Sequence, residues 1–206
     1  MPTDPSTKTN SDGRGQSEAQ GWERLADGVR FALSIHATQR RKGTNIPYGS
    51  HLLGVASLVL EHGGDEEQAI AAMLHDAVED QGAELEPIIR NRFGEKVVNI
   101  VLGCTDADTF PKPPWRERKE AYIRHLDDAA TDVLLVSLAD KVHNARAICT
   151  DVRTHGLVVF DRFKAGREGT LWYYGTLSDA FTRLYPSALA VELQTAVNTM
   201  KRLSAA

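Results

Sequence analysis

Histidine and aspartate stand next to each other at His75 and Asp76, inside an otherwise apolar stretch. The apolar pattern predicts a helix through this pair, and an aspartate in such a helix costs desolvation free energy unless a partner neutralises it. Glu79 follows His75 by one helical turn, and Asp80 follows Asp76 by one turn, so the four groups face broadly one way. A divalent cation is a natural way to hold three mutually repelling carboxylates together. The His-Asp pair alone is also compatible with a hydrogen-bonded core histidine.

Two further positions place a reactive side chain beside apolar residues. Asp140 ends the apolar run 134–139, and Asn144 follows one turn later. This aspartate could belong to a structural hydrogen-bond network, or it could bind a metal with polar support behind it. His51 lies in the first turn of another predicted helix. With His75 and Asp76, these residues make a mixed nitrogen and oxygen ligand set that suits Mn²⁺, Fe²⁺, Zn²⁺ or Mg²⁺ and leaves positions for water and substrate.

The elements that must position these residues are predicted to be helices. Apolar residues recur at helical spacing along most of the chain, and alternating strand patterns are absent. Asp65 is expected to cap one helix and Thr131 another. The predicted helices cover residues 22–41, about 52–60, 66–82, 88–93, 97–102, 116–126, 132–150, 167–184 and 187–203. The predicted fold is therefore all-α, a compact bundle of about eight to ten helices.

Length and composition limit the classes of protein that remain. The 206 residues suit one domain over residues 21–206, after a polar leader over 1–20 that we expect to be disordered. The formal net charge of −4 argues against broad nucleic-acid binding, which depends on Lys and Arg. Cys104 and Cys149 form no CxxC motif, and no apolar run approaches the roughly 20 residues that span a membrane. We expect a cytoplasmic protein with no membrane partner, either monomer or homodimer.

A basic run, Arg40-Arg41-Lys42, precedes the turn that contains Tyr48 and His51. An arginine can stack on a base and can also pair with a phosphate, so this position favours ligand binding. Alternatively, the run is a solvated helix end whose charges interact well with the helix dipole. Tyr48 could pack against a sugar or base, or it could only seal the core.

Four segments, taken in order, resemble the conserved blocks of the hydrolase domain of Rel/SpoT enzymes, and above all the stand-alone small alarmone hydrolases. They are His36-Ala-Thr-Gln-Arg-Arg-Lys-Gly43, Pro47-Tyr-Gly-Ser-His51, Leu74-His-Asp-Ala-Val-Glu-Asp80 and Leu138-Ala-Asp-Lys-Val-His-Asn144. The resemblance covers roughly residues 26–184 and implies an HD-domain fold. It also implies that one divalent metal ion, for which Mn²⁺ is our first expectation, is bound by His51, His75, Asp76 and Asp140.

The same resemblance implies roles for residues around the metal. Glu79 and Asp80 would position or activate the attacking water, Arg41 and Lys42 would lie against the nucleotide, and Asn144 would contact the nucleoside. The chain departs from the family pattern twice, with Leu52 where proline usually follows the first metal histidine and Ser137 where lysine usually precedes Leu-Ala-Asp. Both departures bear on how the substrate is placed.

Further basic residues are candidate substrate contacts. Lys164 and Arg167, together with Arg162, precede the aromatic run Trp172-Tyr173-Tyr174, which is typical of core packing. We expect this basic group near the pyrophosphate end of the substrate. Arg146 could reach the ligand or belong to a polar network, and His36 is expected to be structural.

The expected reaction is metal-dependent hydrolysis of the 3′-pyrophosphate of guanosine tetra- or pentaphosphate, giving pyrophosphate and GDP or GTP. One alternative keeps the same site but assigns it an adenosine alarmone, the 2′-phosphate of NADPH or a deoxynucleotide 5′-phosphate. Another alternative is a non-catalytic module that senses a nucleotide.

Overall fold

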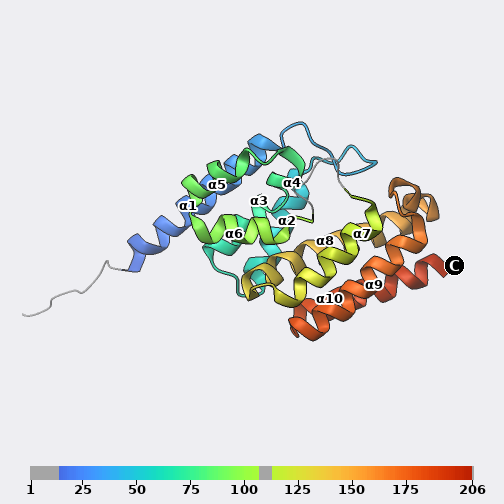
Figure 1. Cartoon of the computed structure of the whole chain (residues 1–206). Coiled ribbons are helices and arrows are strands. Elements are labelled where there is room, and N and C mark those ends of the chain that lie inside the picture. Colours follow the sequence, from blue (N-terminus) through green and yellow to red (C-terminus); the bar gives the residue numbers. More distant parts are fainter. Residues whose placement is uncertain (1–13, 107–112, 206) are drawn as a thin grey trace, which may run out of the picture.

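The computed structural model describes residues 14–106 and 113–205, and these ranges are almost entirely helical (Figure 1). The α-helices are α1 (Arg14–Ile35), α2 (Gly49–Glu61), α3 (Glu66–Leu74), α4 (Ala77–Gln81), α5 (Leu85–Phe93), α6 (Glu95–Cys104), α7 (Trp115–His125), α8 (Thr131–His155), α9 (Gly166–Leu184) and α10 (Ala188–Ala205). Two 3-10 helices, η1 (Leu126–Asp128) and η2 (Leu157–Arg162), flank α8. The all-α prediction is confirmed. Within the described ranges no helix combines the length and apolar content needed to cross a membrane.

Helix α8 is the central element of the bundle. It packs against α2, α3 and α6 on one side and against α9 and α10 on the other, as Figure 1 shows for the last two. Its residues 133–140 are all buried, including the charged side chain at the end of that run, Asp140. An ionisable group is thereby fixed inside the core by apolar packing on its own helix.

Helix α1 differs from its prediction at both ends. It begins at Arg14, so residues 14–20 are helical rather than disordered, and the rest of the expected leader, 1–13, lies outside the described residues. Extending a helix that has already formed costs little free energy, because each added residue gains one hydrogen bond. Residues 14–20 also include good helix formers. The helix ends at Ile35 rather than at residue 41.

The segment after α1 is a closed loop. The backbone nitrogen of Arg41 donates to the Ile46 carbonyl at 2.9 Å, and that of Tyr48 donates to the Gln39 carbonyl at 3.0 Å. These bonds satisfy the backbone across the loop instead of along a helix. The basic run 40–42 therefore lies in a loop and not at a helix end, which removes the helix-dipole explanation for it.

The helix predicted through His75 and Asp76 is broken at this pair. Helix α3 ends at Leu74 and α4 starts at Ala77, with Asp76 at φ −99° and ψ 1° between them. This bridge region of backbone space is sparsely populated and recurs at active sites. The spacing of one turn survives the break, because the Asp80 nitrogen still donates to the Asp76 carbonyl at 2.9 Å.

Helix α3 is capped as predicted. The Asp65 carboxylate accepts from the Gln68 backbone nitrogen at 2.8 Å, and the Gln68 side chain accepts from the Asp65 nitrogen at 2.7 Å. This reciprocal pair satisfies two helix-end donors. The prediction for Thr131 is wrong, because Ala130 occupies the N-cap position of α8, where its side chain has no hydroxyl to accept a hydrogen bond.

Replacing Asp65 by Ala should lower the free energy of unfolding by about 1 kcal/mol, because the α3 cap is lost. Asp65→Asn keeps a cap and loses only the exposed ion pair with Lys96, so it should cost about half as much or less. Urea unfolding followed by circular dichroism measures both. Equal losses in the two variants would show that the ion pair, and not the cap, stabilises this end of α3.

Candidate active site

Four side chains from three segments meet at one point in the bundle. His51 comes from the first turn of α2, His75 and Asp76 from the break between α3 and α4, and Asp140 from α8. The Nε2 atom of His51 lies 3.2 Å from Asp140 Oδ1 and 3.6 Å from Asp76 Oδ2. The Nε2 atom of His75 lies 3.0 Å from Asp76 Oδ2 and 3.7 Å from Asp140 Oδ1. Both imidazoles therefore aim the same nitrogen at both carboxylates.

The chemistry of this cluster fits a divalent metal. Nε2 of His51 and Nε2 of His75 are buried and have no hydrogen-bond partner within the described part of the chain. The other ring nitrogen of His75 lies 2.8 Å from the carbonyl of Ala72, which must accept, so in the neutral imidazole Nε2 carries the lone pair that can bind a metal. Ligand atoms of His51, His75 and Asp76 all lie within 4.8 Å of one another. Two imidazole nitrogens and two carboxylates suit a first-row divalent ion.

The electrostatics keep both carboxyls of the cluster ionised, the form that binds metal. Burial raises the pKa of Asp76, but the adjacent His75 and the nearby imidazole of His51 outweigh it and hold that pKa well below its usual range. Burial likewise raises the pKa of Asp140, and here the ammonium of Lys141 is the largest of the opposing effects that hold the pKa well below the usual range.

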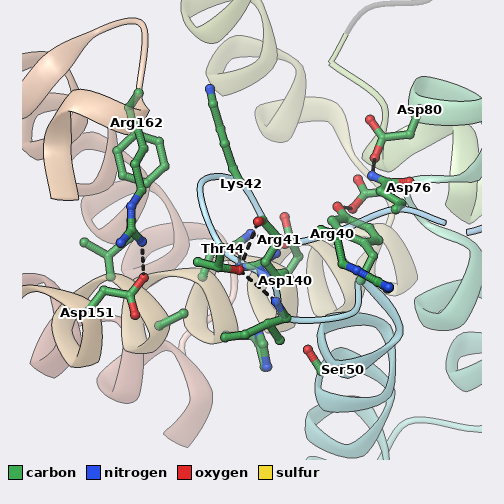
Figure 2. A pocket seen from close by; sticks show the side chains of 18 of the residues that line it. Arg40, Arg41, Lys42, Thr44, Ser50, Asp76, Asp80, Asp140, Asp151 and Arg162 are labelled. Atoms are coloured by element: carbon green, nitrogen blue, oxygen red, sulfur yellow. Dashed lines mark hydrogen bonds and ion pairs between the residues drawn. The ribbon is translucent and has the colours of Figure 1, made fainter. Parts of the chain in front are cut away.

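A pocket of about 490 Å³ opens beside this cluster (Figure 2). It is bounded by the loop 39–48, the first turn of α2, α4, α7, α8, η2 and α9. Among the predicted site residues, those that line it are Arg41, Lys42, Tyr48, Asp76, Glu79, Asp80, Asp140 and Asn144. His51 and His75 lie buried behind the lining.

The basic loop is tied directly to the metal cluster. The Arg41 guanidinium donates to the side-chain oxygen of Asn144, and the amide nitrogen of Asn144 donates to Asp140 Oδ1, each at 2.5 Å. Asn144 is thus a bridge that fixes one proposed nucleotide contact relative to one proposed ligand. Lys42 is exposed and lies 5.7 Å from the centre of the ring of Phe163, another pocket residue.

Tyr48 contacts the metal cluster and also lines the pocket. Its hydroxyl donates a short hydrogen bond to Asp76 Oδ2. Its ring stacks on His36 at 5.3 Å and meets His51 edge-on at 5.4 Å. His36 is buried with Nδ1 bonded to Gln39, as expected for a structural histidine. Tyr48 therefore orients Asp76 from within the pocket wall.

Glu79 and Asp80 lie on α4 at the rim of the cluster. The Asp80 carboxylate accepts from the Gln39 side chain at 2.7 Å, and a carboxylate oxygen of Glu79 lies 3.4 Å from the backbone nitrogen of Asp106. Both acids line the pocket that Asp76 and Asp140 also face. A water between the metal cluster and either acid would be within reach of a proton acceptor.

Three predicted substrate contacts lie elsewhere. Arg146 points away from the pocket and pairs with Glu192 on α10. Arg167 donates to the carbonyl of Ser204 at 3.3 Å, and Lys164 is exposed; neither lines the pocket. Helical geometry explains the placement of Arg146, because residue 146 is six positions from Asp140 and faces another side of α8.

Arg162 is the member of the second basic group that lines the pocket. It pairs with Asp151 at 2.6 Å, as Figure 2 shows at the end opposite Asp76 and Asp80. The sequence pattern did not single out Asp151, Lys119, Lys141 or Tyr174 as pocket residues. Lys141 was detectable as the neighbour of Asp140, whereas Lys119 and Tyr174 reach the pocket only through the packing of α7 and α9.

The HD domain family model matches residues 28–171. The chain belongs to the HD domain family. Guanosine-3′,5′-bis(diphosphate) 3′-pyrophosphohydrolase MESH1 of Xenopus tropicalis is 40% identical over 131 residues, which cover 61% of this chain and 71% of that protein. The Danio rerio protein of the same name is 39% identical over 132 residues with the same coverage. A Synechocystis protein named as a probable 3′-pyrophosphohydrolase is 39% identical over 121 residues, 57% of this HD-domain chain and 16% of that protein.

Solved structures share the fold of this HD domain. One, described as a metazoan ortholog of SpoT that hydrolyses ppGpp, matches with a TM-score of 0.70 and 24% identity over 85% of this chain and 94% of that chain. At this identity the match supports the fold alone. A second, lmo0812 from Listeria monocytogenes, matches with a TM-score of 0.64 and 28% identity over 76% of this chain and 99% of that chain.

Asp76→Ala should lower the affinity for Mn²⁺ by on the order of 100-fold or more, because a charged ligand leaves the cluster. Isothermal titration with Mn²⁺ measures this, and the rise in melting temperature that Mn²⁺ gives the wild type should vanish. Asp161→Ala, on an exposed residue of η2, is the matched control and should bind as the wild type does. Unchanged affinity in Asp76→Ala would remove this residue from the ligand set.

Proposed function

We propose that this HD-domain chain hydrolyses the 3′-pyrophosphate of (p)ppGpp and releases pyrophosphate and GDP or GTP. The observation that supports this most directly is a pair of hydrogen bonds that link Arg41 to Asn144 and Asn144 to Asp140. They hold Arg41, a residue type suited to phosphate and base binding, at a fixed place beside the metal cluster. The relatives named as guanosine-3′,5′-bis(diphosphate) 3′-pyrophosphohydrolases support the same reaction.

The shape of the pocket suits a nucleotide. Its lining follows α8 from Asp140 to Asp151, which at 1.5 Å per residue is a path of roughly 16 Å. Ile148 and Phe163 supply apolar surface at the far end from the metal cluster, where a base can pack. The sugar would then lie near Asn144, with its 3′ oxygen toward Asp140.

The proposed roles follow from this placement. The four ligands are His51, His75, Asp76 and Asp140, and a divalent cation held there would supply Lewis-acid polarisation of the attacked phosphate and make a nearby water more acidic. The water oxygen attacks the phosphorus joined to the 3′ oxygen, and the bond from that phosphorus to the 3′ oxygen breaks. Glu79 or Asp80 accepts a proton from the water at a carboxylate oxygen, and the 3′ oxygen takes up a proton as it leaves.

Mn²⁺ is our proposed metal. Two carboxylate oxygens make the cluster harder than a thiolate site, and two imidazoles make it softer than an all-oxygen magnesium site. The oligomeric state and the cytoplasmic location stay predictions.

Purified protein loaded with Mn²⁺ should release pyrophosphate from ppGpp. A panel run beside it separates the alternatives: an adenosine alarmone also yields pyrophosphate, whereas NADPH and deoxynucleotide 5′-phosphates yield inorganic phosphate. Coupled assays for the two products measure both. Turnover of another panel member with none of ppGpp would refute the proposed substrate, and tight ppGpp binding with no turnover of any would favour a sensing module.

Glu79→Gln should keep Mn²⁺ affinity close to that of the wild type while lowering kcat by ~10²–10⁴-fold, because the proton acceptor is lost and the ligands stay. The same titration and pyrophosphate assay measure the two effects. Glu168→Gln, on an exposed residue of α9, is the matched control. A fully active Glu79→Gln would leave Asp80 as the acceptor and exclude Glu79 from that role.

A further inference from the structure

Lys119 and Lys141 lie in the pocket beside the metal cluster, and neither belongs to the basic loop 40–42. Lys119 comes from α7 and Lys141 from α8, and both line the same pocket as Asp76 and Glu79. Only 19% of the Lys119 side chain and 14% of the Lys141 side chain is exposed to solvent. Burying an ammonium group to this extent costs solvation free energy, so the charges require compensating interactions.

The two lysines repel each other. Burial lowers the pKa of the Lys119 ammonium, and the positive charge of Lys141 lowers this pKa further. A pair of like charges in partly desolvated surroundings is unfavourable unless anions lie against it. The arrangement is therefore suited to a negatively charged ligand.

The carboxylates around the lysines are shared with other partners. Asp106, which is 5% exposed, pairs with both Arg118 and Lys119. The Asp140 carboxylate pairs with Lys141 at 2.6 Å, and it is also a proposed metal ligand. Arg118 and Lys119 share the Asp106 carboxylate, and Asp140 would serve both Lys141 and the metal. Neither of these two carboxylates is therefore reserved for one lysine.

The position of the lysines differs from that of the basic loop. Arg41 reaches α8 at Asn144, one turn beyond Asp140 toward Ile148 and the apolar end of the pocket. Lys141 instead bonds to Asp140 itself, and Lys119 approaches from α7, beside Tyr173, whose ring centre lies 4.9 Å from its ammonium. A substrate with phosphates on both its 3′ and 5′ sides needs two such cationic regions.

We propose that Lys119 and Lys141 form a binding site for the pyrophosphate group that the reaction releases, next to the metal and separate from the basic loop. Its assignment to the leaving group rests on the proposed function. The affinity of the site for pyrophosphate does not rest on the proposed function, because the two lysines would bind this anion whichever nucleotide the enzyme cleaves.

The test is isothermal titration of inorganic pyrophosphate into Mn²⁺-loaded protein. Lys119→Met should weaken pyrophosphate binding at least about tenfold, because one hydrogen bond between charged groups is lost. Lys119→Arg should stay within about threefold of the wild type, because the positive charge remains. Lys201→Met, on an exposed residue of α10, is the matched control and should bind pyrophosphate as the wild type does.

A second variant gives an effect of opposite sign. Asp106→Asn removes the carboxylate that neutralises Lys119, so pyrophosphate should bind more tightly, by a few fold. This variant keeps the proposal testable should Lys119→Met lose its fold, which thermal melting and Mn²⁺ titration would reveal. The proposal is overturned if the wild type binds no pyrophosphate, if Lys119→Met binds it as tightly as the wild type, or if Asp106→Asn weakens it.

These outcomes are distinct from those of the proposed function. Pyrophosphate binding that depends on Lys119, in a protein that does not cleave ppGpp, would retain the anion site and refute the substrate. Cleavage of ppGpp with pyrophosphate affinity independent of Lys119 would retain the substrate and refute the anion site.

Discussion

The convergence of two imidazoles and two carboxylates inside the bundle is the constraint on which the rest of the structure depends. His51 and Asp140 are buried, and each contacts its partners across helices that are distant in sequence. Removing one member of such a buried set leaves the others uncompensated, at a cost of roughly 3–5 kcal/mol. The apolar faces of α2, α3 and α8 must therefore pack in one register, because any other register separates these charges.

That register also decides where the pocket lies. Helix α8 supplies Asp140 to the metal cluster and, on successive turns, Asn144 and Ile148 to the pocket wall. The loop after α1 closes on itself and places Arg41 against Asn144. One helix thus sets the distance between the metal cluster and the apolar surface at Ile148, and the loop adds positive charge.

Charge is arranged around the cluster in an order that suits a polyanionic substrate. Acidic side chains form the centre, where a divalent metal can offset their negative charge. Cationic side chains from the loop, from α7 and from η2 surround them in the same pocket. In a protein of net charge −4, this local concentration of Lys and Arg gives attraction for a small phosphorylated ligand without general affinity for nucleic acid.

The sequence by itself determined the helical fold, the candidate metal ligands and the acids one turn beyond them, because helical periodicity and charges within apolar runs are local signals. It also pointed to Arg41, Tyr48 and Asn144. Only the tertiary structure decided that the backbone breaks at His75–Asp76, that Arg146 faces away, and that Lys119 enters the pocket. The break was hidden because Asp76 is held by contacts with Tyr48 and the histidines, which come from other segments. Which side of a helix meets which neighbour depends on packing between distant segments, and no local spacing encodes it.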